Sequence, residues 1–170
     1  MQTGLPFEEI YHAHKDMVYN LCLNFLQNPQ DAEEVTQDVF VKVHEKQASF
    51  REQSSLKTWV YRIAVNQCLD ALKARKRQKR FGFFTNIFGH ENTVEREIPD
   101  FNHPGVQLEQ REALEALYRR IDALPDNQKT AIILKYLDEL PQKEIADIMQ
   151  ISVKAVESLL MRGKQNLEKK

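Results

Sequence analysis

The sequence has few of the residues that mark secreted, redox-active or membrane proteins. It contains 2 cysteines, 1 tryptophan, 5 glycines and 6 prolines among 170 residues, and its net charge is −1. Cys22 and Cys68 lack the spacing of a CxxC pair and fall among apolar residues at helical positions, so we expect buried, reduced thiols. The longest apolar runs, such as residues 131–134, are far too short to cross a bilayer.

These absences argue against several classes of protein. Residues 1–10 have no cationic region followed by an apolar core, so we expect no signal peptide and a cytoplasmic protein. The chain has no glycine-rich phosphate loop, no cluster of metal ligands and no nucleophile beside a base, so we expect neither an enzyme nor a bound cofactor or metal. His12 and His14 are two residues apart and would point away from each other on a helix, which disfavours a metal site.

Apolar residues recur at intervals of three and four along most of the chain, and no segment alternates as a strand does. The pattern predicts one helix at about 6–27 and a second at about 31–46, with Asp31 and Glu34 as a reciprocal cap. It predicts a third helix from Leu56 that frays in a run of Lys and Arg.

The last forty residues carry the pattern of a helix-turn-helix. A short helix, QKEIADIM, follows Pro141, and a longer helix begins at Val153 with Ser152 as its N-cap. Ala146 is small where the two helices must approach each other. Two ordinary helices of a bundle would be the alternative explanation.

The periodicity is lost before this region, and residues 81–105 contain three Gly and two Pro. We therefore predict an all-α protein with two small helical domains, a bundle at 1–80 and a helix-turn-helix domain at 108–170, joined by a flexible linker at 81–107. The linker contains aromatic residues that we expect to dock on the protein's own domains or on a partner. They are Phe81, Phe83, Phe84 and Phe88.

Positive charge gathers at the end of the third predicted helix, where six of the eight residues from 73 to 80 are basic. The run follows an amphipathic stretch with Trp59 and Tyr61, so one helix offers rings that can stack on bases and cations that can hold phosphates. Each feature alone has an ordinary explanation, since such rings are usually core and a basic helix end is often only solvated. Together with the helix-turn-helix pattern, they favour DNA binding by two modules.

Three blocks of this sequence resemble the extracytoplasmic-function class of bacterial RNA polymerase sigma factors. They are DAEEVTQDVFVKVHEK (31–46), FREQSSLKTWVYRIAVNQCLDAL (50–72) and LPDNQKTAIILKYLDELPQKEIADIMQISVKAVESLLMRGKQNL (124–167). The resemblance implies a dissociable subunit that binds core RNA polymerase, recognises the −35 and −10 promoter elements and traps the melted non-template strand. It also implies an anti-sigma factor, often membrane-bound, that holds the free protein inactive.

The resemblance assigns site residues in three groups. The group that would bind polymerase is Glu34, Gln37, Asp38 and Phe40. The group that would bind the −10 element is Phe50, Arg62, Asn66, Asp70, Lys73, Arg75, Lys76 and Arg77. The group that would bind the −35 element is Lys143, Ser152, Lys154, Glu157, Ser158, Arg162 and Lys164.

Three positions depart from the family pattern. Asp70 stands where an amide or neutral residue is expected, Glu157 where many relatives carry Arg, and Gln150 where a small turn residue is usual. We expect Trp59 to belong to the core and Phe50 to be the ring that stacks on an extruded base, with Asn66 reading its edge.

Two other functions fit the pattern. The first is a helix-turn-helix regulator that acts without polymerase, with residues 1–80 as a dimerisation or sensor domain. A more distant one is a structural or signalling adaptor in which the basic run is only a solvated helix end.

Overall fold

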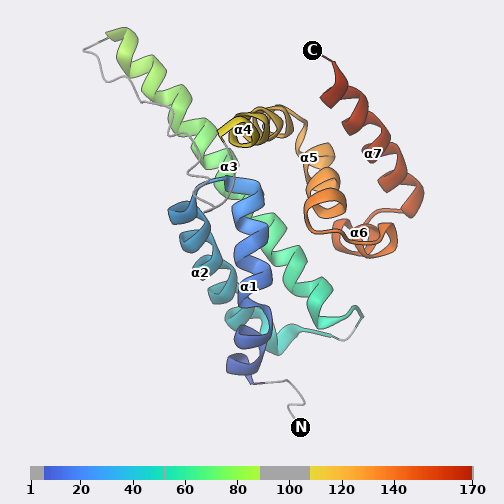
Figure 1. Ribbon diagram of the computed structural model, residues 1–170. Helices are drawn as coiled ribbons and strands as arrows, with labels where there is room; N and C mark the ends of the chain where they lie inside the picture. The colour runs from blue at the N-terminus through green and yellow to red at the C-terminus, as the bar shows by residue number, and fades with distance from the viewer. Residues whose placement is uncertain (1–5, 52, 89–107, 170) are drawn as a thin grey trace.

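The computed structural model describes residues 6–51, 53–88 and 108–169. For residues 81–88 and 108–110 it describes the backbone alone. All secondary structure in these ranges is helical, as the periodicity predicts, and Figure 1 shows the helices in two groups. No helix in the described ranges is long and apolar enough to cross a membrane.

The N-terminal group is a three-helix bundle. It comprises α1 (Phe7–Leu26), α2 (Pro29–Lys46) with the short 3₁₀ turn η1 (Gln47–Ser49), and α3 (Leu56–Phe88). Each of the three long helices packs on the other two. Their apolar stripes meet in one core whose fully buried members include Val18, Leu21, Phe25, Val39, Val43 and Val60.

The start of α2 differs from the prediction. The helix begins at Pro29, and Asn28 is its N-cap, because the Asn28 side chain accepts a hydrogen bond from the N–H of Asp31 at 3.0 Å. Proline suits the first turn because its missing N–H would have no helical partner there. The Asn28-Pro29 pair therefore starts α2. α1 ends at Leu26, and its C-cap Gln27 adopts a left-handed backbone with φ of 57°.

The third helix is longer than predicted. α3 does not fray in the basic run but continues through it to Phe88, so residues 81–88 are helical where the prediction placed a linker. Lys and Arg are good helix formers, and residues 73–88 contain no proline to end the helix. The side chains of the linker's aromatic cluster lie outside the described residues, so their docking stays a prediction.

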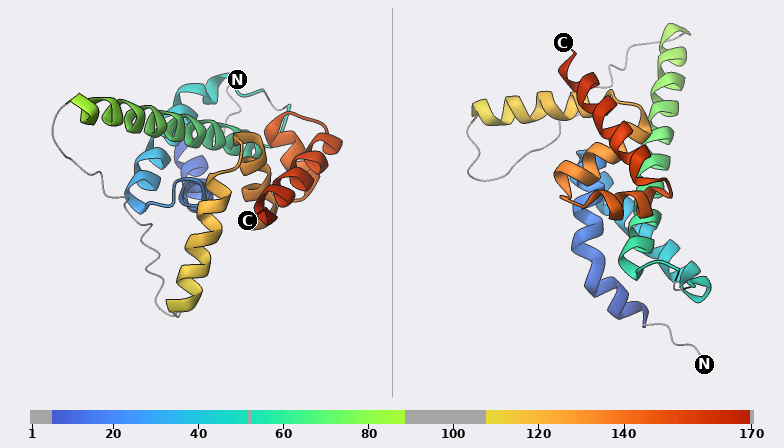
Figure 2. Two further views of the ribbon diagram at one scale, coloured as in Figure 1. Left: turned by 90° about the horizontal axis from the view of Figure 1, so that it is seen from above. Right: turned by 90° about the vertical axis from the view of Figure 1, so that its right-hand side faces the viewer.

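The C-terminal group carries the predicted helix-turn-helix. Its elements are α4 (Leu108–Asp122), α5 (Asp126–Ile132), the π-turn η2 (Ile133–Leu137), α6 (Gln142–Met149) and α7 (Val153–Glu168). Figure 2 shows α7 lying across α5 and α6, and both pairs of helices are in contact.

A glycine allows the close approach of α7 to α5. Gly163 is buried, and a Cβ added to it would lie only 2.9 Å from Cγ1 of Ile132. Ile145 and Val156, which are fully buried, fix α6 and α7 in the same small core. This packing holds α7 with its opposite face toward solvent.

Both cysteines are buried and reduced, as predicted. Cys22 on α1 and Cys68 on α3 are fully buried, and their Sγ atoms lie 3.6 Å apart. The contact belongs to the packing of the N-terminal bundle.

Candidate nucleic-acid interface

The exposed face of α7 begins at its N-cap. The Oγ of Ser152 accepts a hydrogen bond from the N–H of Ala155 at 3.1 Å, which confirms the predicted cap. This bond satisfies one of the free N–H groups at the start of the helix. Lys154, Glu157 and Arg162 follow along the exposed face, with Ser158 half-buried between them.

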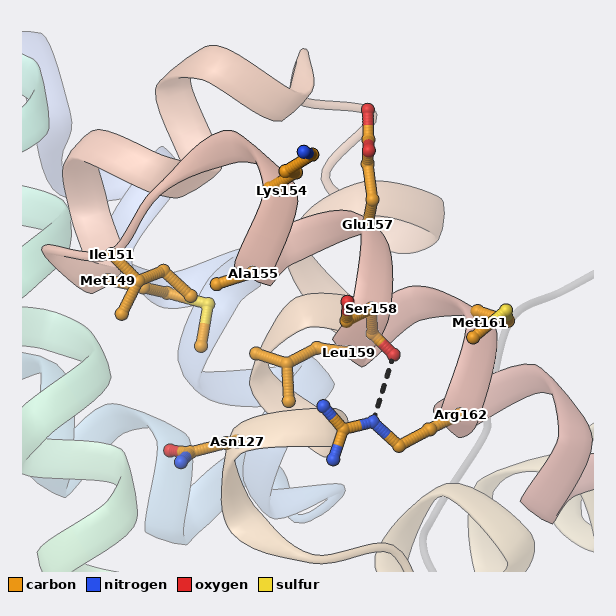
Figure 3. Close-up of a pocket in the computed structure, with 10 residues that line it drawn as sticks. All are labelled: Asn127, Met149, Ile151, Lys154, Ala155, Glu157, Ser158, Leu159, Met161 and Arg162. Carbon is orange, nitrogen blue, oxygen red and sulfur yellow. Dashed lines mark hydrogen bonds between the residues drawn. The ribbon is translucent and has the colours of Figure 1, made fainter.

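A shallow hollow of about 770 Å³ runs along this face. Four of the residues predicted for the −35 element line it, and Met149, Ile151, Leu159 and Met161 supply its apolar part. In Figure 3 the Arg162 guanidinium turns toward the Asn127 side of the hollow, and its Nε donates to the carbonyl of Ser158 at 3.3 Å. Lys154 and Glu157 line the hollow as well, and both side chains are exposed.

The two other cations predicted for the −35 element lie apart from the hollow. Lys143 is exposed on α6. The Nζ of Lys164 lies over the ring of Tyr136, 5.1 Å from its centroid. That cation–π contact holds the ammonium at the surface, where it is still accessible to an anion.

A second polar surface lies along α3. Arg62, Asn66, Asp70, Lys73 and Arg77 follow one another at intervals of three and four, so they form one stripe on the helix. All of them are exposed except Arg62, which is half-buried. The Nζ of Lys73 lies 4.0 Å from Oδ1 of Asp70, so a cation stands beside the carboxylate that departs from the family pattern.

Two other basic residues of α3 lie beside this stripe and pair with acidic residues of other helices. Arg75 pairs with Asp31 of α2 at 3.7 Å, and Lys76 pairs with Asp126 of α5 at 3.9 Å. Exposed pairs of this kind contribute little and exchange readily, so both side chains remain able to bind a phosphate.

Phe50 directly follows η1, six residues before the start of α3, and contacts Trp59. Their ring centroids are 5.0 Å apart with a 44° angle between the planes. Trp59 is half-buried and packs against the core, which confirms the expectation for that ring. Phe50 is half-buried as well, so an extruded base could reach only the part of its ring that Trp59 leaves open.

On α2, three of the four residues predicted to bind polymerase are exposed, namely Glu34, Gln37 and Asp38. Phe40 is different: it is 4% exposed, and its ring packs edge-on against Tyr11 with the centroids 4.8 Å apart. A role for Phe40 at the surface does not fit this packing, because its ring faces α1. Val41, which is 54% exposed, follows Gln37 by one helical turn, and the sequence reasoning missed it although the spacing could have revealed it.

The two helical groups also contact each other. The Nε and Nη2 of Arg62 donate to the carbonyl of Asp147 at 2.9 and 2.7 Å, and the Nδ2 of Asn24 donates to Oδ1 of Asp138 at 3.0 Å. Burial raises the pKa of Asp138, while hydrogen bonds from Asn24 and Tyr61 oppose that shift. Sequence reasoning identified neither Asn24 nor Asp138, since no local pattern marks either side chain as a contact between the two helical groups.

No group of three or more His, Cys, Asp or Glu side chains in the described part of the chain could hold a metal ion. The polar surfaces on α3 and α7 therefore offer hydrogen bonds and charge. α3 and α7 expose Arg, Lys, Asn and Ser side chains, and these residue types suit the recognition of nucleic acid.

Comparison with known proteins identifies the two helical groups. Residues 10–78 match the model of sigma-70 region 2, and residues 114–167 match the model of sigma-70 region 4. The two modules together define a protein of the sigma-70 class.

Relatives narrow this class to one family. The chain is 32% identical over 165 residues to the ECF RNA polymerase sigma factor SigW of Bacillus subtilis, covering 96% of this chain and 87% of the relative. It is 31% identical over 140 residues to the ECF RNA polymerase sigma-E factor of Escherichia coli K12, covering 82% and 73%. The chain belongs to the ECF family of RNA polymerase sigma factors, which are transcription initiation factors and not enzymes.

Solved structures share the fold. The sigma factor RpoE of Bartonella quintana, in complex with the anti-sigma factor NepR, superposes with a TM-score of 0.64 at 19% identity, covering 95% of this chain and 94% of that one. CnrH, in complex with the cytosolic domain of CnrY, gives a TM-score of 0.63 at 20% identity, covering 95% and 84%.

Proposed function

We propose that this protein is a dissociable promoter-specificity subunit that binds core RNA polymerase and directs initiation at promoters with particular −35 and −10 elements. One observation carries the proposal: regions 2 and 4 occur in one chain, in that order, and each exposes a polar helix face. The protein performs no covalent chemistry and needs no cofactor. It supplies contacts to DNA that form only at a promoter.

The exposed face of α7 reads the −35 element in the major groove. Lys154, Ser158 and Arg162 can donate to base acceptors, and Glu157 can accept from the amino group of cytosine. Ser152 caps the N-terminus of α7 and so keeps the start of that helix in position at the DNA, while Lys143 and Lys164 bind phosphates. The carboxylate of Glu157 weakens attraction to DNA in general, so this module depends on polymerase to hold it at the promoter.

The stripe on α3 captures the −10 element after the strands separate. Asn66 reads the edge of an extruded base that rests against Phe50, and Asp70 can accept a hydrogen bond from the same base. Arg62 and Lys73 hold the strand through its phosphates, together with Arg75, Lys76 and Arg77. Unstacking a base costs a few kcal/mol, which these contacts offset.

The exposed face of α2 binds the polymerase. Glu34, Gln37 and Asp38 form an acidic polar patch, with Val41 beside them as an apolar contact. An acidic surface suits a protein partner better than DNA. One structural neighbour, RpoE, is a sigma factor in complex with an anti-sigma factor, which supports an anti-sigma factor as a second partner of this chain.

Reconstitution with core RNA polymerase tests the proposal. Purified protein and core enzyme should together start transcription from a subset of genomic promoter fragments, and neither should do so alone. The measurement is run-off transcription combined with footprinting of each fragment. A footprint by the protein alone on duplex DNA, without initiation on any fragment, would instead identify a regulator that acts without polymerase.

A further inference from the structure

We propose that Cys22 and Cys68 form a redox-active pair, which hydrogen peroxide oxidises to a disulfide that links α1 to α3. The pair lies in the core of the N-terminal bundle, so its oxidation does not depend on the function proposed above. The proposal assigns a reversible covalent modification to two thiols that lie outside the residues proposed to bind DNA and polymerase.

The fold brings the two cysteines of the chain into direct contact. Cys22 lies on α1 and Cys68 on α3, 46 positions further along the sequence, and their Sγ atoms are 3.6 Å apart. A disulfide bond is about 2.0 Å long, so the two atoms need to approach by roughly 1.6 Å. Packed helices shift by distances of this order. The sequence contains 2 cysteines, so no third thiol competes for either partner within the chain.

The surroundings of the pair make Cys22 the nucleophile. The Sγ of Cys68 donates a hydrogen bond to the Sγ of Cys22, and this bond lowers the pKa of Cys22. Burial opposes that shift, and a hydrogen bond with Thr36 lowers the pKa further. The pKa of Cys68 is raised, first by its hydrogen bond to Cys22 and then by burial. Because the thiolate is the reactive form, Cys22 should react first and Cys68 second.

The oxidation takes two steps. The sulfur of Cys22 attacks one oxygen of hydrogen peroxide, so an S–O bond forms and the O–O bond breaks. The hydroxide that leaves takes the proton of the Cys22 thiol and becomes water, and Cys22 becomes a sulfenic acid. The sulfur of Cys68 then attacks the sulfur of Cys22, so an S–S bond forms and the S–O bond breaks. The second hydroxide takes the proton of Cys68, so the two thiols lose two electrons and one peroxide yields two waters.

Burial of the pair selects the oxidant. Both thiols are fully buried, so a reagent reaches them only when the bundle opens locally. Hydrogen peroxide is small and uncharged and needs only a slight opening, whereas oxidised glutathione is a bulky anion that needs a much larger one. Hydrogen peroxide should therefore oxidise the folded protein, and oxidised glutathione should not.

The disulfide would fix α1 to α3 and leave the exposed face of α3 in place. A link between residues 22 and 68 closes a long loop in the unfolded chain and lowers its entropy, which stabilises the folded bundle. Asn66 and Asp70 are exposed, on the side of α3 opposite the buried Cys68. The oxidised bundle should therefore resist unfolding and still present its polar stripe.

Peroxide treatment of the full-length protein tests the modification. We expect peptide mapping to show residues 22 and 68 joined, with the loss of two hydrogen atoms from the linked pair. Neither thiol should then react with a maleimide in urea until dithiothreitol restores both. The midpoint of urea unfolding should rise by about 1 M in the oxidised protein and return on reduction. Oxidised glutathione should change none of these readouts.

Single variants separate the roles of the two thiols. Cys68→Ala keeps the nucleophile beside Thr36 and removes the thiol that resolves the sulfenic acid, so dimedone should trap that acid on Cys22. Cys22→Ala should give about tenfold less trapped product on Cys68. Cys22→Ala combined with Cys68→Ala is the matched control, because peroxide can still oxidise the 4 methionines of the chain. Circular dichroism should show equal helix content in all variants.

Several results would overturn the proposal. Two thiols that stay free after peroxide treatment, or a disulfide that joins two molecules, would show that the pair does not react within the chain. A linked pair without a rise in the urea midpoint, or an equal rise in the double variant, would show that the bond does not fix α1 to α3. More dimedone on Cys68 than on Cys22 would contradict the assignment of the nucleophile. Peptide mapping of the wild type decides the modification even where a variant fails to fold.

Discussion

Neighbouring residues of α3 divide between the core and the surface. Val65 is 7% exposed and Cys68 is fully buried, whereas Asn66 and Asp70 are exposed on the opposite side of the helix. A substitution at Asn66 therefore changes the surface of the bundle and leaves its packing intact. This separation allows the roles of single residues to be tested without loss of the fold.

Replacing Asn66 by alanine should impair promoter opening and leave the affinity for core polymerase unchanged. The amide supplies a donor and an acceptor for an extruded base, and alanine supplies neither. Loss of one such contact should slow opening about tenfold, as read by permanganate reactivity of the melted strand. Gln78→Ala, at another exposed position of α3, is the control, and an equal loss of polymerase binding by Asn66→Ala would contradict the assignment.

From the sequence, the chemical type of each site residue is predicted better than whether its side chain is exposed or engaged in another contact. Asn66 and Asp70 are exposed as a surface role requires, whereas Phe40 is buried against Tyr11 and Arg62 is engaged by Asp147. The position of Phe40 in the sequence fits the buried face and the exposed face of α2 equally well. Only the packing of α1 on α2 shows that Phe40 is buried. The partner of Arg62 lies 85 residues away, so no local pattern could reveal it.

The helices themselves owe their ends to individual side chains. α2 begins after Asn28 and α7 after Ser152, and each of these side chains accepts a hydrogen bond from the N–H three residues on. The cap of α7 was predictable, because Ser152 precedes a new apolar stripe. That of α2 was not, since Asn28-Pro29 is equally typical of a helix end, and the length of α3 was missed because a charged run has no apolar period.

Loss of the cap of α7 should destabilise the C-terminal module. Ser152→Ala removes the acceptor for the N–H of Ala155 and should lower the free energy of unfolding by about 1 kcal/mol, measured in urea. Ser152→Asp supplies another acceptor and should recover that loss. If both variants were equally unstable, the hydroxyl would matter for a reason other than capping.

The contact between the two modules includes one partly buried carboxyl group, that of Asp138. Asp138, with a pKa raised by burial, binds a proton more tightly in the folded protein than in the unfolded chain. The neighbouring hydroxyls of Tyr61 and Tyr118 also have raised pKa values, as has the thiol of Cys68, so none of them titrates in the same range. Protonation of Asp138 should therefore favour the folded protein.

Acidification should stabilise the wild type relative to Asp138→Asn. Because the folded pKa of Asp138 is raised, the gain should appear as the pH falls through that pKa and be complete below 3.8, its ordinary value. His14, whose pKa is lowered by burial and by Lys57, changes stability in the opposite direction, and the carboxylate of Glu144 lies 3.6 Å from the Nζ of Lys57. Both remain in the variant, so urea unfolding of the two proteins between pH 7 and pH 4 isolates Asp138, and parallel curves would contradict the shift.

The docking of the modules could not be predicted from the sequence. Asn24 and Asp138 are 114 residues apart, and no local pattern connects two positions so distant in the sequence. They meet only once both modules have folded and α1 lies beside η2.

The number of residues in the π-turn η2 affects how the two modules dock. The N–H of Asp138 donates to the carbonyl of Ile133, five residues back, at 3.1 Å. Deleting one residue of the turn, such as Lys135, would restore the four-residue spacing and rotate everything beyond it by about 100°. Asp138 would then face away from Asn24, and α6 would present another side to α3. One inserted or deleted codon at this turn could thus change how the modules meet in a descendant protein, with every side chain of the interface unaltered.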